Sequence, residues 1–164
     1  MLNPTDGTVT LGTFELADAP MLVEADRDPE HRRRFDFPEE FVPSLAHSEA
    51  VIARWQRQRE LGERFAYAVR IIGSGELVGG VELAPLGNGS ANLSYWTRPL
   101  RRKRGYATRA AALACDLAFA EFGYHSLRIV VDLDNVASRR IAEQCDFRET
   151  GMSEGRLLYV RESA

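Results

Sequence analysis

The sequence predicts a single domain of the mixed α/β (α+β) class, and three observations support this. The chain has 164 residues, of which 45% are hydrophobic and 27% are charged, as in one globular domain over residues 1–164. Three strand-like runs between residues 65 and 97 are joined by short turns, which predicts an antiparallel meander. Beyond residue 91, a strand, a helix and an apolar strand follow one another, which predicts a right-handed crossover to a parallel neighbour.

The first third of the chain is predicted to contain a short strand, two helices and an irregular segment between the helices. A short strand is expected within residues 8–15, followed by a helix that Asp18 can cap. Residues 30–47 have the least regular pattern and are predicted to form a loop with helical turns. Ser48 is expected to cap the next helix, which runs to Glu60.

The meander is expected to consist of three strands that end at glycine-containing turns. The first turn is Gly73-Ser74-Gly75 and the second is Gly87-Asn88-Gly89, and both favour tight hairpin-type connections. The three predicted strands cover residues 65–72, 76–84 and 91–97.

The C-terminal half alternates predicted helices and strands. Ala110, Leu113, Ala114 and Leu117 follow the spacing of one helix face, and that helix is expected to end at Gly123. The remaining predicted elements are an apolar strand at 125–132, a helix capped by Asn135, and strands at 147–151 and 157–160.

The composition excludes several classes of protein. Cys115 and Cys145 both fall in helical patterns, so two buried thiols are expected rather than a disulfide framework or a metal site. No apolar run is long enough to span a membrane, and the first six residues lack the basic stretch of a secretion signal. A cytoplasmic protein without membrane contact is therefore expected.

Charge is distributed unevenly along the chain. The net charge of −3 argues against a dedicated nucleic-acid binder, so no nucleic-acid partner is expected. Four consecutive cations, Arg101 to Arg104, nevertheless stand directly before Gly105 and a predicted helix. Taken alone, such a run is typical of a solvated surface or of a nucleic-acid patch. Its place at the start of a helix favours a binding site for phosphate instead.

The turn at Gly105 has the features of a phosphate site. A helix start presents unpaired backbone N–H groups and about half a unit of positive charge. Gly105 and the small Ala107 allow an anion to approach these groups closely, and the preceding cations add positive field. The turn lacks the Gly-Lys-Ser/Thr of nucleotide hydrolases and the three-glycine pattern of dinucleotide-binding proteins.

Three segments together resemble a known family. Arg102-Lys103-Arg104-Gly105-Tyr106-Ala107 is similar to the Gln/Arg-x-x-Gly-x-Gly/Ala signature of the GNAT N-acetyltransferase superfamily. Tyr95-Trp96-Thr97-Arg98-Pro99 before it and Asn135-Val136-Ala137-Ser138 after it resemble the RimJ/RimL-type branch. The order of predicted elements agrees over nearly the whole chain. Two residues depart from the branch: Asn92 stands where an acidic residue is frequent, and Asp146 where glycine precedes a phenylalanine, so the helix before Asp146 is expected to end by another route.

The resemblance implies a fold and a co-substrate. The implied GNAT fold has a six- to seven-stranded, mixed, mostly antiparallel sheet with helices on both faces and two central parallel strands that splay apart. The implied co-substrate is acetyl-CoA, without a metal, and its diphosphate would bind the turn at Gly105. The residues expected to bind acetyl-CoA are Trp96, Thr97, Arg102, Lys103, Arg104, Gly105, Tyr106, Ala107, Thr108, Asn135 and Ser138.

The resemblance also implies acetyl transfer to a primary amine by direct attack on the thioester in a ternary complex. A backbone N–H near Thr97 is the candidate donor to the developing oxyanion. Ser138 is the candidate that protonates the CoA thiolate, and otherwise it only completes a helix start. Tyr95 is expected either to hydrogen-bond the substrate or to pack. Asn92 puts the water-relayed base of the branch in doubt. Glu82, on the strand before, is the candidate base, and otherwise it is an exposed strand residue.

The amine acceptor is expected to be a protein N-terminus or a small molecule, selected by residues 28–48. Arg32, Arg33 and Arg34, with the phenylalanines of this segment, are candidates for a partly apolar pocket that takes an acidic or aromatic acceptor, unless these cations face solvent. The alternative function is a catalytically impaired CoA-binding sensor or partner-binding module on the same fold. The C-terminal strands predict a free sheet edge, which would allow a homodimer.

Overall fold

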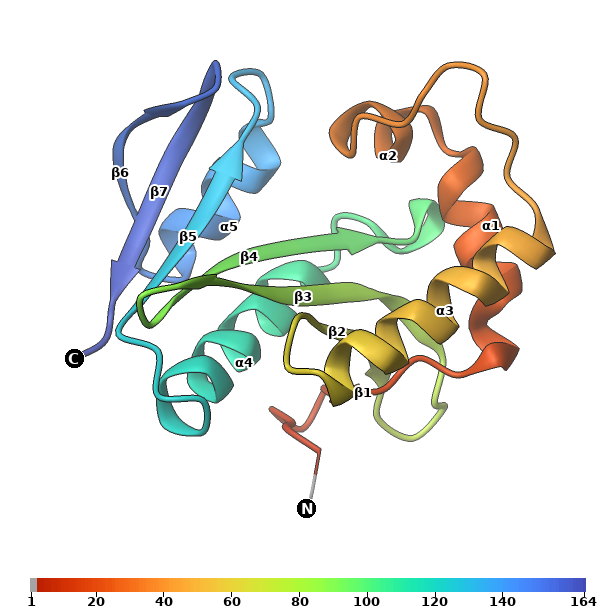
Figure 1. The fold of residues 1–164 in the computed structure, drawn as a ribbon, viewed down its shortest axis with the longest axis horizontal. Helices are drawn as coiled ribbons and strands as arrows, with labels where there is room; N and C mark the ends of the chain where they lie inside the picture. The colour runs from red at the N-terminus through yellow and green to blue at the C-terminus, as the bar shows by residue number, and fades with distance from the viewer. Residues whose placement is uncertain (1–2) are drawn as a thin grey trace.

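A seven-stranded sheet with helices on both faces forms the protein, as described by a computed structural model of residues 3–164 (Figure 1). Met1 and Leu2, which belong to the predicted 1–164 domain, lie outside the described residues. The strand order is β1-β2-β3-β4-β5-β7-β6. The strands are β1 (Val9–Gly12), β2 (Phe65–Ile71), β3 (Leu77–Gly87), β4 (Ser90–Thr97), β5 (Ser126–Val131), β6 (Arg148–Ser153) and β7 (Arg156–Glu162). The helices are α1 (Ala19–Arg27), α2 (Pro29–Arg34), α3 (Leu45–Glu60), α4 (Tyr106–Ala120) and α5 (Val136–Gln144), with short 3-10 turns η1 (Leu16–Asp18) and η2 (Pro99–Arg101).

The strands β2 to β4 form the predicted antiparallel meander, which β1 extends at one edge. Two adjacent glycines in β3 let Trp96 of β4 pack closely against β3. A Cβ atom at Gly79 would collide with the Trp96 carbonyl oxygen, and one at Gly80 would collide with the Trp96 indole. Gly80 therefore leaves room for the Trp96 ring, and Gly79 leaves room for the backbone of β4.

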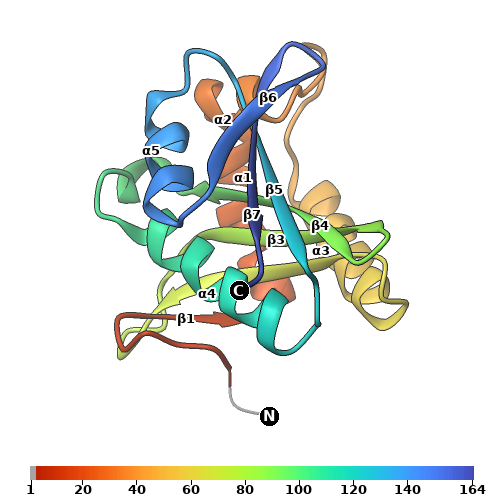
Figure 2. The same cartoon turned by 90° about the vertical axis from the view of Figure 1, so that its left-hand side faces the viewer.

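The strands β4 and β5 are parallel neighbours that pair over a short stretch only. Residues 90–92 pair with residues 126–128, and the two strands share no further pairing within residues 3–164 (Figure 1). Beyond this point β5, β7 and β6 run across the direction of β1 to β4, as Figure 2 shows. The predicted pair of splayed central strands is confirmed.

Each face of the sheet has its own hydrophobic core. α4 covers one face, where its alanines and Cys115 pack against residues such as Leu93. α1 and α3 cover the other face, where Leu22 and Ile52 pack against the small alanines of β2. Cys115 and Cys145 are buried free thiols, as predicted.

One prediction in the first third of the chain is wrong, and it concerns the cap of α3. α3 begins one turn earlier than predicted, because the side chain of Ser44, not that of Ser48, accepts a hydrogen bond from the His47 N–H at 3.1 Å. Ser48 lies inside the helix and is fully buried. The segment predicted as a loop with helical turns contains the short helix α2, which Asp28 caps by accepting a hydrogen bond from the His31 N–H at 2.9 Å.

α5 ends through a residue in the left-handed conformation, although this residue is not glycine. Asp146 has a φ of 65°. The Asp146 N–H donates to the Glu143 carbonyl at 3.1 Å, and the Phe147 N–H donates to the Ala142 carbonyl at 2.9 Å. This is the Schellman arrangement, which usually has glycine at the position of Asp146. The departure noted in the sequence therefore leaves the form of the helix end unchanged.

We expect Asp146→Gly to stabilise the protein. Glycine adopts a positive φ without strain, and the relief outweighs the greater flexibility of the unfolded chain by about 0.5–1 kcal/mol. Thermal unfolding should show a Tm higher by about 1–4 °C. As a control, Glu143→Gly inside α5 should lower Tm, because glycine is unfavourable at an ordinary helical position. A lower Tm for Asp146→Gly would contradict the strain argument.

Candidate functional site

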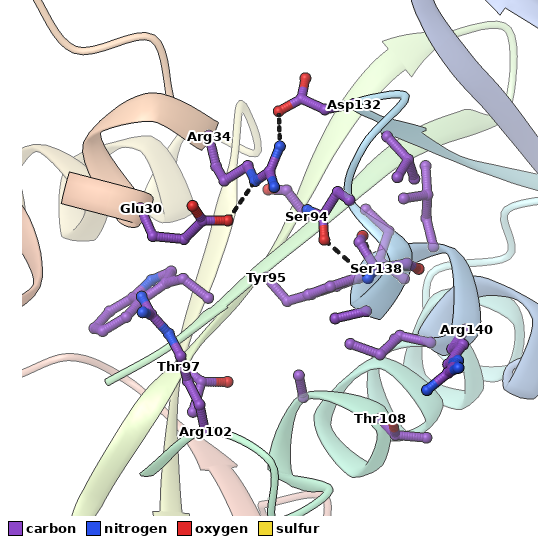
Figure 3. A pocket seen from close by; sticks show the side chains of 18 of the residues that line it. Glu30, Arg34, Ser94, Tyr95, Thr97, Arg102, Thr108, Asp132, Ser138 and Arg140 are labelled. Carbon is purple, nitrogen blue, oxygen red and sulfur yellow. Dashed lines mark hydrogen bonds and ion pairs between the residues drawn. The ribbon is translucent and has the colours of Figure 1, made fainter. Parts of the chain in front are cut away.

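A cleft of about 690 Å³ opens where β4 and β5 diverge (Figure 3). The two strands form its walls, the start of α4 and one face of α5 form one end, and α2 lies at the other. The first turns of α4 and α5 therefore face one common cavity. The predicted cofactor residues that line it are Trp96, Thr97, Arg102, Lys103, Gly105, Tyr106, Ala107, Thr108, Asn135 and Ser138.

The N-terminus of α4 has the geometry predicted for an anion site. Gly105 precedes the helix, and its φ of 81° lies in the left-handed region that favours glycine. A Cβ atom at Gly105 would meet no atom within 4 Å, so the space beside the turn is open. The N–H groups of the first turn have no partner within the helix, and Tyr106, Ala107 and Thr108 line the cleft.

The four consecutive cations before this turn differ in their surroundings. Arg101 and Arg102 line the cleft, but both already bind a carboxylate. Arg101 donates to Glu76 and Arg102 donates to Asp28, each at 2.6 Å. Lys103 also lines the cleft, and no carboxylate of residues 3–164 lies within 4 Å of its ammonium group. Arg104 does not line the cleft, so the geometry does not support its predicted contact with acetyl-CoA.

Two of the predicted catalytic residues lie in direct contact. The Tyr95 Oη on β4 is 2.6 Å from the Ser138 Oγ in the first turn of α5. Figure 3 shows the two side chains side by side in the cleft. Burial raises the pKa of the Tyr95 phenol, so this hydroxyl keeps its proton at neutral pH. Asn135 lines the cleft and also accepts a hydrogen bond from the Ser138 N–H at 3.1 Å, which confirms it as the helix cap. These contacts hold both hydroxyls at the wall of the cleft.

The candidate base is not in the cleft. Glu82 lies on β3 and forms an ion pair with Arg64, with an Nε–Oε1 distance of 3.3 Å. Burial raises the pKa of Glu82, but its side chain is not among those that line the cavity. Asn92 does line the cleft, and its Oδ1 accepts a hydrogen bond from the Arg128 Nε at 3.3 Å. The geometry therefore gives no support to Glu82 as the base.

Ion pairs fasten α2 to the opposite wall. Arg34 donates to Glu30 within α2 at 2.7 Å, to Asp132 at 2.8 Å and to Asp134 at 2.7 Å, and Figure 3 shows how Arg34 reaches across the cleft to Asp132. Arg156 at the start of β7 binds Asp132 at 2.9 Å. The carboxylates of the cleft lining in residues 3–164, Glu30 and Asp132, are thus both held by arginine.

The predicted acceptor segment contributes fewer residues to the cleft than expected. Of its arginines and phenylalanines, Arg34 and Phe35 line the cavity. Arg32 instead donates to backbone carbonyls, such as that of Phe41 at 2.8 Å. Arg33 is exposed and pairs with Asp134, which lies outside the cavity lining, and with Glu30. The arginines are therefore already paired, which removes the argument for an acidic acceptor.

His31 is a cleft residue that the sequence pattern did not reveal. Its ring is buried and packs edge-on against Trp96 and at a tilt against Phe35, with ring centroids 5.5 and 4.7 Å away. Burial lowers the pKa of His31 to about 4, so the imidazole is neutral at physiological pH. Its Nε2 lies 3.7 Å from Asp26, whose pKa is raised to about 6 by burial. The end of the cleft beside α2 is thus partly aromatic and contains a neutral histidine.

Two further observations concern membrane-spanning helices and metal sites. No helix within residues 3–164 is both long and apolar enough to cross a membrane. In the same part of the chain, no three His, Cys, Asp or Glu side chains gather in a way that could hold a metal ion.

Comparison with protein families gives one match, which covers most of the chain. Residues 8–148 match the model of the acetyltransferase (GNAT) domain. No curated protein matches the chain in sequence.

Many solved structures share this fold. RimJ from Mycobacterium smegmatis in complex with CoA-disulfide has 21% identity and a TM-score of 0.81, over 94% of this chain and 82% of that one. RimL, a ribosomal L7/L12 alpha-N-protein acetyltransferase in complex with coenzyme A, has 18% identity and a TM-score of 0.83, over 99% and 98% of the two chains. A chimera of the Vibrio cholerae spermidine N-acetyltransferase SpeG and hSSAT has 19% identity and a TM-score of 0.74, over 94% and 95%.

We expect His31 to make the stability of the protein depend on pH. Its pKa is about 4 in the folded protein and 6.5 in the unfolded chain. Between these values the unfolded chain binds the additional proton, so the free energy of unfolding falls on the order of 3 kcal/mol as the pH drops from 6.5 to 4. His31→Phe removes this contribution. Thermal melts should therefore show its Tm rising relative to the native protein as the pH falls.

Asp26→Asn is a matched comparison of opposite sign. The pKa of Asp26 is raised from 3.8 to about 6, so the folded protein keeps a proton that the unfolded chain has lost. This contribution to stability is complete below pH 3.8 and is lost as the pH rises through 6. The Tm of Asp26→Asn relative to the native protein should therefore fall as the pH drops from 7 to 4. If both variants shifted in the same direction, the two pKa assignments would be wrong.

Proposed function

Because the chain belongs to the acetyltransferase (GNAT) domain family, we propose that it moves the acetyl group of acetyl-CoA to a primary amine of a protein N-terminus or of a small molecule. One observation carries the proposal: the open N-terminus of α4 and the Tyr95–Ser138 hydroxyl pair face the same cleft. An anion site and a proton donor are thus available to the two ends of one extended ligand.

The residues of the cleft suit the parts of acetyl-CoA. Its volume of about 690 Å³ is in the range of sites for small molecules. The first turn of α4 and Lys103 offer N–H groups and positive charge to the diphosphate. The edge of β4 that faces β5 has no strand partner beyond Asn92 in residues 3–164. The backbone groups on this edge are therefore available to the amides of pantetheine. When bound, acetyl-CoA supplies the acetyl group as a thioester, which is an activated acyl donor.

In the proposed reaction, the residues of this chain orient the reactants and move protons. Attack of the amine nitrogen on the thioester carbon forms the new carbon–nitrogen bond and breaks the carbon–sulfur bond. A backbone N–H near Thr97, at the free edge of β4, stabilises the negative charge that develops on the carbonyl oxygen. The Ser138 hydroxyl, hydrogen-bonded to Tyr95, gives a proton to the leaving thiolate, and the proton that the amine nitrogen loses as it becomes an amide restores the hydroxyl.

The incoming amine must lose a proton before it attacks, and this favours an α-amino group. The carboxylates in the cleft lining of residues 3–164 are occupied by Arg34, and Glu82 lies outside it. An α-amino group has a pKa of about 8 and is partly neutral at physiological pH, whereas a lysine-type amine has a pKa of about 10.4. Without a free carboxylate in the cleft lining of residues 3–164, acceptors with the lower pKa have the advantage.

A second candidate function is a CoA-binding sensor or partner-binding module with little or no catalysis. Two observations favour it: Asn92 stands where relatives of the RimJ/RimL type frequently have an acidic residue, and Glu82 does not line the cleft. Both functions require the same cofactor site, so turnover and not binding separates them. A homodimer through the edge strand β6 and a location in the cytoplasm stay predictions.

The direct test is a thiol-release assay with acetyl-CoA and a panel of amines, peptides and aminoglycosides. We expect turnover with one or more acceptors, and faster turnover with peptide N-termini than with lysine-type amines. Binding of CoA without turnover on a broad panel would favour the sensor. A titration in which CoA does not bind at millimolar concentration would exclude both.

We expect Gly105→Asn to weaken CoA binding much more than it changes stability. Asparagine tolerates a positive φ and can cap a helix, so Tm should change by only a few degrees. Its side chain would fill the open space beside the turn and compete for the N–H groups of α4. The dissociation constant of CoA, measured by calorimetry, should rise on the order of tenfold or more. Unchanged affinity would place the diphosphate elsewhere.

We expect Ser138→Ala to lower kcat on the order of 10²-fold, while the affinity for CoA stays nearly constant. Tyr95→Phe should have a similar but smaller effect, because it removes the hydrogen bond to Ser138. In the double variant the losses should not add, since the two hydroxyls act as one unit. Steady-state kinetics with CoA titrations checks this. Equal losses in kcat and in CoA affinity would indicate a binding role instead.

A further inference from the structure

The cations of the cleft fall into two groups according to their partners. Six lysine or arginine side chains of residues 3–164 line the cavity. Arg34, Arg101, Arg102 and Arg156 each have a carboxylate within 4 Å. Lys103 and Arg140 also line the cavity, and no carboxylate of the described chain lies that close to either side chain. These two cations therefore carry the positive charge of the cleft that is not already compensated.

Arg140 lies on the face of α5 that borders the start of α4. Cleft-lining positions on this helix include Ala137, Arg140 and Gln144, which follow the helical spacing of one face. Gln144 accepts a hydrogen bond from the Thr108 hydroxyl of α4 at 3.3 Å, so this face meets the first turn of α4. In Figure 3, Arg140 lies near Thr108 and far from Arg34 at the opposite end of the cleft.

The neighbouring arginine has a different environment, although it is adjacent in sequence. Arg139 donates to the Tyr159 hydroxyl at 3.4 Å and lies 3.8 Å from the Glu149 carboxylate, and it does not line the cleft. Successive residues of a helix point about 100° apart, which explains the difference. Arg139 and Arg140 therefore form a natural pair of test and control positions.

We propose that Arg140 binds the 3′-phosphate of the coenzyme, and thereby lets the protein distinguish CoA from dephospho-CoA. This inference rests on the proposed function. The nucleotide end of CoA has two separate anionic groups, the diphosphate and a phosphomonoester on the ribose. The start of α4 with Lys103 serves the first group, and the second needs its own cation beside it.

The chemistry of arginine suits this role. A guanidinium group can donate two parallel hydrogen bonds to one phosphate, which makes such pairs stronger and more selective than contacts with neutral donors. Arg140 has no carboxylate to displace, whereas Arg102 would have to share its guanidinium with Asp28. The side chain is exposed, so salt should weaken this contact.

The test compares two ligands and two variants by calorimetry at constant low salt. The ligands are CoA and dephospho-CoA, and the variants are Arg140→Gln and Arg139→Gln. We expect the native protein to bind CoA about tenfold more tightly than dephospho-CoA. Arg140→Gln should lose this preference by weaker binding of CoA alone, and Arg139→Gln should keep it.

Dephospho-CoA serves as the internal control for folding and for the diphosphate site. If the native protein bound both ligands equally well, or if Arg140→Gln weakened both alike, the inference would be overturned while cofactor binding stood. The inference would also be overturned if Arg139→Gln removed the preference as completely. If neither ligand bound the native protein, the proposed function itself would fail, which is a different result.

Discussion

The short parallel pairing of β4 with β5 is the constraint on which the rest of the structure depends. Three residue pairs join the two strands, and beyond Asn92 the edge of β4 has no ladder partner within residues 3–164. Buried backbone groups without partners are costly, so such an edge persists where a cleft exposes it to water or to a ligand. α4 connects the two strands, and α5 follows β5, so both helices begin at this opening. The divergence thus brings an anion site and a hydroxyl pair together.

Ion pairs keep the walls of the cleft in place. Arg34 joins α2 to the turn after β5, and Arg102 joins the turn before α4 to Asp28, which caps α2. Partly buried pairs with several partners hold geometry better than isolated surface pairs, which contribute little. The side chain of Arg34 is 15% exposed and has three carboxylate partners. α2 is therefore linked both to the turn before α4 and to the turn after β5.

Much of the fold, and the turn at the start of α4, could be predicted from local patterns. Hydrophobic periodicity and the turn at Gly105 both depend on residues that are close together in the sequence. The failures are of a different kind. Ser44 and Ser48 lie one helical turn apart, so the apolar pattern of α3 suits either as the cap. The contact between Tyr95 and Ser138 joins residues far apart in sequence, and two of the three carboxylate partners of Arg34 are about 100 residues away, so neither could be predicted from spacing. Glu82 lies outside the cleft, where it pairs with Arg64, and the strand pattern alone does not reveal this tertiary contact.

Backbone amide signals of the protein, followed by NMR as CoA is added, test the central claim most directly. If the coenzyme lies between the splayed strands with its diphosphate at the start of α4, the largest shifts should fall on residues 93–97 and 103–108, with small changes on β1 and α3. Shifts concentrated on β1 or α3, or none at saturating CoA, would contradict this account of the cleft.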